Sequence, residues 1–419
     1  MKESAMTGKP RILKENNRRL VLDLLRKSDA ISVSEISAKV DLSKTTVMKI
    51  IDYLVRTGVA LPAGKGHSTE VGGKKPTMFR FNERAGYVIA VHIFTDEIYS
   101  VIMDLHTTIL FDCSSPLKED ESLAVVLAAI VSSCQKLMRK AGIDAHSLLG
   151  IGIGTHGITN NKDGILYVSP HFPSWGTNIR FRDLLEEQLP FAVPITLENN
   201  CRMQAIAEKI RGVATDKRNI VAVEAGTGLG SGIIVQDEIK WGVHYLSGEI
   251  GHMVINPKTE ERCACGGRGC FEVMVSTKRL LRLAKESYQE HPDSVIFQGG
   301  QKNMTAEGIF DAANAGDTLA RALMDDIISW FAIGFSNVIV MYDPEIIIIQ
   351  GIYTRAGDYF LENLREKVNE VSLVRIKKDV QIEYSRFGKE RGVIGSAAHI
   401  ISEYFQEGAF CTDKGSWKR

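Results

Sequence analysis

The sequence has no apolar run that approaches the roughly 20 residues needed to span a bilayer. Its first residues lack the apolar core of a secretory signal peptide. Of its 7 cysteines, three fall between positions 263 and 270, which is unlike the wide spacing of a secreted disulfide framework. A composition of 44% hydrophobic and 24% charged residues also excludes a disordered chain. We therefore expect a cytoplasmic protein that does not associate with a membrane.

The chain lacks net charge, but the two signs are unevenly distributed. Residues 1–82 carry 16 Lys and Arg against 8 Asp and Glu, whereas residues 83–419 carry 35 against 43. A chain of 419 residues also exceeds one ordinary domain of about 100–200 residues. The charge boundary therefore predicts an N-terminal domain over 1–82 that binds a polyanion and a body over 83–419 that does not.

The basic N-terminal region contains three helical patterns. Apolar residues form one stripe along 16–27, and a second short helix is predicted near Ser32, with Glu35 as its capping-box partner. A tight turn then precedes a third helix, whose apolar residues repeat at i, i+3, i+4 and i+7. A basic, glycine-rich segment follows and leads into strand-like residues 78–81. This order predicts a winged helix-turn-helix over residues 1–82.

The polar face of the third helix and the basic segment after it are typical of DNA contact. Helix side chains at such positions read base edges in the major groove, while lysines of a wing approach phosphates. A three-helix protein-interaction module is the alternative, and the agreement of turn, wing and charge favours DNA. We expect contacts to DNA from seven residues: Lys44, Thr45, Thr46, Lys49, Lys65, Lys74 and Lys75.

The remainder of the chain alternates strand and helix patterns, which predicts an α/β fold with two lobes and a cleft. A glycine run over 226–232 lies between two strands, and no helix begins directly after it. A Rossmann dinucleotide site is therefore excluded, while a tight β-turn and a phosphate-holding hairpin both stay open. The expected elements are a helix at 123–140 and strands at 87–93, 98–105, 149–154, 193–197, 219–224 and 346–349.

Four candidate metal ligands cluster in the middle of the chain. His252 ends the run GEIGH, and Cys263, Cys265 and Cys270 follow in CACGGRGC, whose glycines allow the loop to fold back. Zn²⁺ favours a Cys₃His tetrahedron, and four protein ligands leave no open position for a reactive water. We therefore predict a structural zinc, with unligated buried thiols as the alternative. The glutamates that bracket this loop would be held rigidly, as acceptors for sugar hydroxyls.

At these residues the sequence resembles the ROK family, which groups sugar-responsive repressors with sugar kinases. The resemblance depends on GEIGH, the CxCGxxGCxE run, the GTGLGSG turn and DPEIIIIQG, which occur in the family's order. It covers nearly the whole chain and points to the repressor branch with a winged helix-turn-helix. It implies an actin/hexokinase-like body, with lobe 1 over about 83–197 plus the C-terminal helix and lobe 2 over about 198–390. It also implies a sugar site in the cleft, a structural zinc, and operator binding as a homodimer or homotetramer.

The resemblance also implies which residues contact the sugar. His252 would serve both the zinc and the sugar. His171 stands where the family usually has Asn, in the loop that covers the sugar, and the segment 154–157 on the sugar's other side departs from the family at His156. The expected set is Asn199, Asn200, Glu249, His252, Glu272, Thr155 and His171.

Two further departures from the family bear on kinase chemistry. Family kinases carry an Asp as the base that takes the sugar hydroxyl proton, and here that position is Asn200, whose amide cannot carry the proton. The family's first phosphate loop, Asp-x-Gly-Gly-Thr, aligns with residues 92–96, where the acid and both glycines are gone. Phe94 would block the close backbone approach that phosphates need. The glycine turn at 226–232 alone survives, so we expect no enzymatic activity.

These features together predict a sugar-responsive transcriptional repressor, whose operator binding is released or modulated by a sugar in the cleft. An active ATP-dependent sugar kinase with a DNA-binding head is one alternative, and Asn200 and Phe94 argue against it. A regulator controlled by a partner protein is another alternative, which only binding tests separate. The identity of the sugar and the operator sequence stay open, because hydroxyl stereochemistry is resolved by side-chain placement.

Overall fold

The N-terminal part of the chain folds as helices and a small antiparallel sheet. The computed structural model describes residues 9–66, 75–371 and 379–406, so the predicted DNA contact Lys74 lies outside the described residues. The helices are α1 (Lys9–Arg26), α2 (Val33–Val40) and α3 (Lys44–Arg56). The strands, in spatial order, are β1 (Ile31–Ser32), β3 (Thr77–Phe81) and β2 (Ala60–Lys65).

Side chains at the helix starts fix where α2 and α3 begin. Ser32 accepts from the Glu35 N–H at 3.3 Å, and the Glu35 carboxylate accepts from the Ser32 N–H at 2.8 Å, which confirms the predicted capping box. Ser43 caps α3 by accepting from the Thr46 N–H at 3.1 Å. Between the two helices Asp41 takes a left-handed φ of 52°, which reverses the chain sharply. The apolar face of α3 is therefore buried: Val47, Ile50, Ile51 and Leu54.

In the described residues of the body, most strands belong to two five-stranded sheets. In the first sheet β11, β7 and β4 run parallel, and β5 is antiparallel to both of its neighbours. Helices α4 (Leu123–Ala141) and α5 (Phe181–Gln188) pack on one face of it. In spatial order its strands are β11 (Ile195–Asn199), β7 (Leu148–Thr155), β4 (Tyr87–Ile93), β5 (Glu97–Asp104) and β6 (Ile109–Pro116). A small sheet beside it contains β10 (Thr177–Ile179), β9 (Ile165–Val168) and β8 (Ile158–Asn160).

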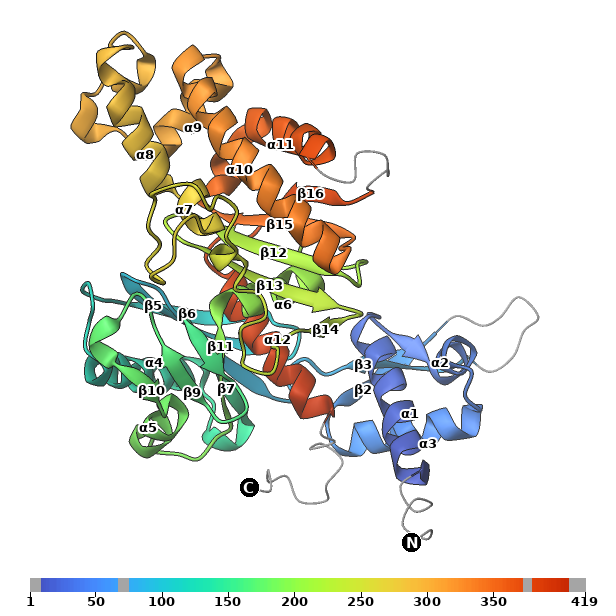
Figure 1. The fold of residues 1–419 in the computed structure, drawn as a ribbon. Helices are drawn as coiled ribbons and strands as arrows, with labels where there is room; N and C mark the ends of the chain where they lie inside the picture. The colour runs from blue at the N-terminus through green and yellow to red at the C-terminus, as the bar shows by residue number, and fades with distance from the viewer. Residues whose placement is uncertain (1–8, 67–74, 372–378, 407–419) are drawn as a thin grey trace, which may run out of the picture.

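The second sheet is covered by a layer of helices (Figure 1). Its strands, in spatial order, are β14 (Glu238–Ile239), β13 (Leu229–Val235), β12 (Ile220–Ala225), β15 (Ile346–Gly351) and β16 (Gln381–Tyr384). The helices are α7 (Phe271–Val275), α8 (Thr277–Glu286), α9 (Ala306–Ala315), α10 (Thr318–Tyr342) and α11 (Gly357–Val371). The six strands predicted for the body are thus confirmed, with ends shifted by no more than two residues.

Helix α10 is long and strongly apolar. Among the described residues it is the one helix whose length and composition would allow it to cross a bilayer, but most of it is buried inside the protein. Phe331 and Phe335 of α10 pack edge to face on Phe271 of α7. Gly334 between them admits that ring, since a Cβ there would lie 2.3 Å from it. Helix α10 is therefore a core helix of the second lobe.

Two helices lie between the sheets and pack against each other (Figure 1): α6 (Asn200–Arg211) and α12 (Arg391–Gln406). Helix α6 packs on β12 and β13 of the second sheet, while α12 packs on β4 and β7 of the first. Gly395 of α12 permits the close approach, because a Cβ there would lie 1.7 Å from the carbonyl oxygen of Met203. The two helices therefore form the boundary between the lobes.

The C-terminal end of α12 contacts the N-terminal part of the chain, toward which it runs in Figure 1. The ring centroids of Phe405 and of Phe81 in β3 lie 6.4 Å apart. The guanidinium carbon of Arg26 lies 5.8 Å from the ring centroid of Phe405 and 5.9 Å from that of Phe81. Phe81 also contacts His106, in the turn between β5 and β6, at 5.1 Å. Buried apolar residues of the two parts form one continuous cluster. Helix α12 thus connects the interlobe boundary with the N-terminal helices.

Candidate functional site

Four side chains that the sequence grouped as metal ligands lie together in the structure. The ligand atoms of His252, Cys263, Cys265 and Cys270 all lie within 4.8 Å of one another. Cys263 Sγ is 3.6 Å from His252 Nδ1, and Cys265 Sγ is 3.7 Å from Cys270 Sγ. Zinc bonds of about 2.3 Å to sulfur and about 2.0–2.1 Å to nitrogen give tetrahedral S···N and S···S edges of about 3.6 and 3.8 Å. The cluster therefore fits a tetrahedrally bound metal ion.

The backbone of the loop brings these sulfur atoms together. Gly269 has a φ of 63°, and a Cβ there would lie 1.8 Å from the carbonyl oxygen of Asn256, so only glycine fits. The Cys263 N–H donates to the carbonyl oxygen of Gly267 at 2.9 Å, and the Gly266 N–H donates to that of Cys263 at 3.0 Å. The glycines of the motif thus determine the shape of the loop, and the loop in turn brings the sulfur atoms together.

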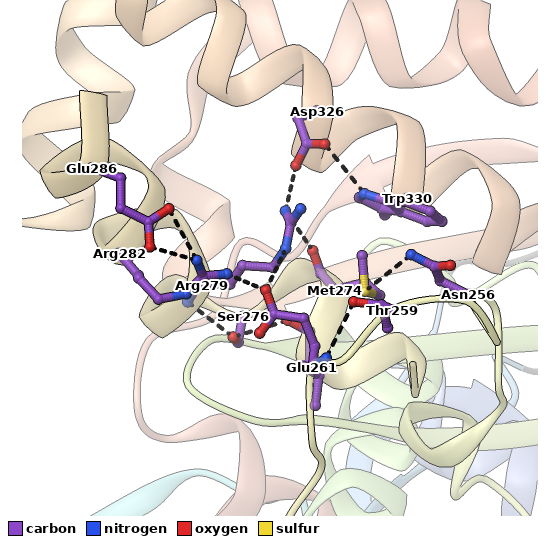
Figure 2. Close-up of polar contacts among 11 residues, drawn as sticks. Asn256, Thr259, Glu261, Met274, Ser276, Arg279, Arg282, Glu286, Asp326 and Trp330 are labelled. Atoms are coloured by element: carbon purple, nitrogen blue, oxygen red, sulfur yellow. Dashed lines mark hydrogen bonds and ion pairs between the residues drawn. The ribbon is translucent and has the colours of Figure 1, made fainter. Parts of the chain in front are cut away.

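Ion pairs join the loop over residues 252–270, which we call the metal loop, to α8 and α10 (Figure 2). Arg279 of α8, whose side chain is only 11% exposed, lies between Glu261 of the loop, at 3.6 Å, and Asp326 of α10. It also donates to the carbonyl oxygen of Met274 at 3.3 Å. Arg282, nearly one turn along α8, pairs with Glu261 as well. Because the planar guanidinium of Arg279 has several partners at once, it holds the loop rigidly against the helical layer.

Glu272 joins the metal loop to the glycine turn. One of its carboxylate oxygens accepts from the Leu229 N–H at 2.9 Å, and the other lies 3.7 Å from Cys263 Sγ. The Thr277 N–H, at the start of α8, donates to the carbonyl oxygen of Gly226 at 2.9 Å. The glycine run forms the turn of the β-hairpin between β12 and β13, a geometry that both interpretations of the sequence share.

Glu249 lies in the same region, three residues before His252. Burial raises the pKa of Glu249, while the positive charge of the nearby Arg202 guanidinium acts in the opposite direction. Arg202 of α6 donates to the carbonyl oxygen of Ser247, two residues before Glu249, at 3.2 Å, which places Glu249 near the start of α6. A carboxyl group at this boundary between the lobes can accept hydrogen bonds from the hydroxyls of a ligand.

The predicted sugar-contacting residues on β7 and α6 differ in what they are free to bind. Asn199 caps α6: its Nδ2 donates to the carbonyl oxygen of Gly157, and its Oδ1 accepts from the Cys201 N–H, both at 2.8 Å. Thr155 is fully buried. Asn200 is 2% exposed, and neither of its amide atoms has a hydrogen-bond partner among the described residues. The amide of Asn199 is thus partly used to cap α6, whereas both polar atoms of Asn200 are without a protein partner in the described part of the chain.

Three histidines form a row from the surface into the first lobe. The exposed ring of His171 lies 4.7 Å from that of His156, which lies 6.3 Å from that of His92. His92 is 1% exposed and stacks on Phe94 at 4.0 Å. Burial, followed by the charge of His171, lowers the pKa of His156 to about 3, and burial also lowers the pKa of His92 well below its usual value. Both inner imidazoles are therefore neutral at pH 7.

We expect acid to destabilise the protein through these histidines. Between pH 6.5 and 3 the unfolded chain protonates His156 and the folded chain does not, so the free energy of unfolding falls as the pH falls. The loss is about 1.4 kcal/mol per pH unit, or about 2 kcal/mol from pH 6.5 to pH 5. The free energy of unfolding is measured in urea at pH 7 and at pH 5. On going from pH 7 to pH 5, that of His156→Gln should fall by about 2 kcal/mol less than that of the native protein. The exposed His146→Gln is the matched control, and equal losses in both variants would contradict this account.

An ion pair that the sequence analysis missed lies beside the glycine turn. Arg391, the first residue of α12, donates to both carboxylate oxygens of Glu224 at 2.8 Å. Glu224 lies in β12, two residues before the turn. The pair therefore lies beside the glycine turn, and Phe94 stacks on His92 in the segment 92–96 that we aligned with the first phosphate loop of the family from the sequence. No local sequence signal links Arg391 to Glu224, because 167 positions separate them.

A second unpredicted feature is a buried ion pair at the start of α6. Arg202 and Glu198 are each 1% exposed and lie 2.9 Å apart. Arg202 also donates to the carbonyl oxygens of Tyr245 and Ser247 at 2.5 and 3.2 Å, and Glu198 accepts from the indole N–H of Trp241 at 2.5 Å. The pair therefore fixes the loop that leads from β14 into the GEIGH run.

In the N-terminal part, most of the predicted DNA-contact residues are exposed. Thr46 is half-buried, and its hydroxyl lies 2.8 Å from Ser43 Oγ, so it is partly engaged at the helix start. Met48 of α3 is 43% exposed and was not among the predicted contacts. The exposed members of the predicted set are Lys44, Thr45, Lys49, Lys65 and Lys75.

These features define a two-lobed, hexokinase-like α/β protein. The model of the ROK family matches residues 88–403, and the chain belongs to that family. The resemblance expected from the sequence is therefore confirmed. A ROK hexokinase from Thermus thermophilus has the same fold, with a TM-score of 0.64 at 23% identity over 76% of this chain and 98% of that one.

Relatives of both functional branches are similar to this chain. A xylose repressor of Caldicellulosiruptor bescii is 29% identical over 94% of this chain and 98% of that protein. A glucokinase of Thermotoga maritima is 31% identical over 60% of this chain and 79% of that protein. The solved ROK-family transcriptional regulator described as a homologue of E. coli MLC has a TM-score of 0.80 at 23% identity, over 95% of this chain and 98% of that one. The repressor-type matches thus include the N-terminal part.

Proposed function

We propose that the protein is a sugar-responsive transcriptional repressor, with a winged helix-turn-helix over residues 1–82 and a sugar-binding ROK body over 83–419. The observation that carries the proposal is the path of α12. Its first residue, Arg391, lies beside the glycine turn, and its far end packs Phe405 on Phe81. A ligand between the lobes therefore has a direct structural route to the N-terminal helices. Full-length similarity to xylose repressors supports the same function.

The proposed sugar site lies between the metal loop and the first lobe. In this proposal Asn200, Glu249, His252, Glu272 and His171 contact the sugar. Asn199 and Thr155 act behind them by shaping the backbone of β7 and α6. A structural zinc on the Cys₃His cluster holds His252 and the adjoining glutamate in place. D-xylose is the first effector to test, because the repressors similar to this chain are named for it.

The test begins with selection of an operator from random duplex DNA by the full-length protein. Affinity for that DNA is then measured with D-xylose, D-glucose, N-acetylglucosamine or no sugar. Allosteric coupling is typically 1–3 kcal/mol, so the effector should change the affinity by about 5- to 150-fold. Glu249→Ala should bind DNA normally but ignore the sugar, whereas the exposed Glu290→Ala should behave like the native protein. No enriched sequence, or no response to any sugar, would refute the proposal.

DNA contacts of two kinds should be separable by mutation. The selected operator should be an inverted repeat, because a symmetric dimer or tetramer presents paired recognition helices. Thr45→Ala on α3 should relax sequence preference by about 1–3 kcal/mol for each lost base contact. Lys75→Ala on the wing should weaken binding to all sequences and lower the slope of log K against log salt by about one. Exposed Lys140→Ala, on α4 of the body, is the control. A wing variant with changed preference and an unchanged slope would contradict this docking.

The ROK body should have no sugar kinase activity. A general base contributes about 10²–10⁴-fold in rate, and Asn200 cannot act as one. Asn200→Asp should still give no useful turnover, because Phe94 remains in the segment that resembles the first phosphate loop and the Arg391–Glu224 pair remains beside the glycine turn. ATP consumption with D-xylose and D-glucose measures this, and the Thermotoga maritima glucokinase is the positive control. Sustained turnover by the native chain would establish an enzyme.

A further inference from the structure

Three buried polar side chains meet where α6 and α12 cross the first sheet. His92 of β4, Asn200 of α6 and Ser396 of α12 are 1%, 2% and 1% exposed. Within the described ranges of the chain, His92 Nδ1, both amide atoms of Asn200 and Ser396 Oγ have no hydrogen-bond partner. Each buried polar group without a partner costs about 1–3 kcal/mol, and native proteins rarely leave several together. We call His92, Asn200 and Ser396 the polar triad.

Two glycines show that the polar triad faces one place. A Cβ at Gly154 of β7 would lie 2.9 Å from Asn200 Oδ1 and 3.6 Å from Ser396 Oγ. His92 pairs with Gly154 on the adjacent strand, and a Cβ at Gly392 of α12 would lie 1.9 Å from His92 Nδ1. Asn200 and Ser396 therefore approach each other over Gly154, while His92 packs on α12 one turn before Ser396, so the three side chains lie in one region of the interlobe boundary.

The chemistry of the polar triad suits a neutral group. Burial keeps the His92 imidazole neutral, and the positive charge of the nearby Arg391 acts in the same direction. Arg391 is itself neutralised by both carboxylate oxygens of Glu224. A hydroxyl group both donates and accepts, so it can accept from the Asn200 amide and donate to an imidazole nitrogen or amide oxygen. A phosphate or carboxylate would find no free positive charge among these three side chains.

We propose that the polar triad is the subsite for one hydroxyl group of the effector sugar, and that Ser396 and His92 determine specificity there. This inference rests on the proposed function, and an ordered water has the same chemistry and is the competing occupant. Ser396 lies on α12, whose far end packs on Phe81. A sugar bound at the polar triad therefore contacts the helix that leads to the N-terminal part.

The test compares Ser396→Ala with Ser336→Ala in the full-length protein. Ser336 of α10 is also 1% exposed, and its hydroxyl also has no partner in the described part of the chain, so it is a matched control in another core. Binding of D-xylose, D-glucose and N-acetylglucosamine is measured by calorimetry. Ser396→Ala should lower the affinity for the sugar that the native protein binds by about 2- to 13-fold. This is the equivalent of one hydrogen bond of about 0.5–1.5 kcal/mol. Ser336→Ala should bind it unchanged.

A second variant tests whether sugar binding needs the space beside the Asn200 amide, and it leaves the Ser396 hydroxyl in place. Gly154→Ala puts a methyl group against the Asn200 amide and should abolish sugar binding, with folding checked by thermal unfolding. If a sugar binds the native protein and both the Ser396 and Gly154 variants equally well, the polar triad holds water only and the inference is wrong, while the proposed function stands. If no sugar binds the native protein and operator affinity never responds, the proposed function fails and the inference fails with it.

Discussion

Replacing Cys265 with serine should remove one tightly bound metal ion per chain and abolish the sugar response. The exposed Cys265 thiol belongs to a cluster whose spacing fits a tetrahedral ion, and serine does not replace a thiolate ligand. A ligand that binds only the folded state stabilises it by about 4 kcal/mol at 1,000 times its Kd. Losing the ion should therefore lower the unfolding temperature strongly. It should also release Glu272, whose carboxylate joins the loop to the glycine turn.

Elemental analysis and thermal unfolding measure this directly. Native protein should contain close to one zinc per chain, and a strong chelator should reproduce the effect of the substitution. Cys134→Ser, a buried thiol on α4 outside the cluster, should keep its metal. A native protein purified without metal that still responds to sugar would show that the Cys₃His cluster needs no ion.

Replacing Arg202 with methionine should lower the free energy of unfolding by about 3–5 kcal/mol, because it leaves the charge of Glu198 buried without its partner. The carbonyl oxygens of Tyr245 and Ser247 lose their donor at the same time. Since these residues lead into the GEIGH run, the variant should also bind sugar more weakly. Denaturant unfolding and calorimetry measure the two effects.

Two controls isolate the buried charge. Arg202→Met combined with Glu198→Gln should recover part of the lost stability, because the remaining group is neutral. Arg180→Met removes an exposed pair with Asp183 and should cost less than about 1 kcal/mol. An Arg202 variant as stable as the Arg180 variant would mean that water reaches Glu198 and that the pair is not essential to the fold.

The sequence by itself determined the features that depend on residues near one another in the chain. The capping box of Ser32 and Glu35 needs only a spacing of three residues, and the structure confirms it. The metal ligands fall within 19 positions, and glycines such as Gly269 turn the loop back on itself. Strand ends were predicted to within two residues, because burial on both faces gives continuous apolar runs. Family membership followed from these same local motifs.

Only the tertiary structure decided which distant side chains meet. Arg391 and Glu224 are 167 positions apart, and the Asn200–Ser396 approach over Gly154 needs both interlobe helices in place. The motif assigned Asn199 to the sugar, and only the fold shows that its amide also caps α6. Hydrophobic pattern specifies that an element is buried, but not which polar group of another element lies opposite. That choice is made by the packing of α6 on α12, which leaves the polar triad buried between the lobes.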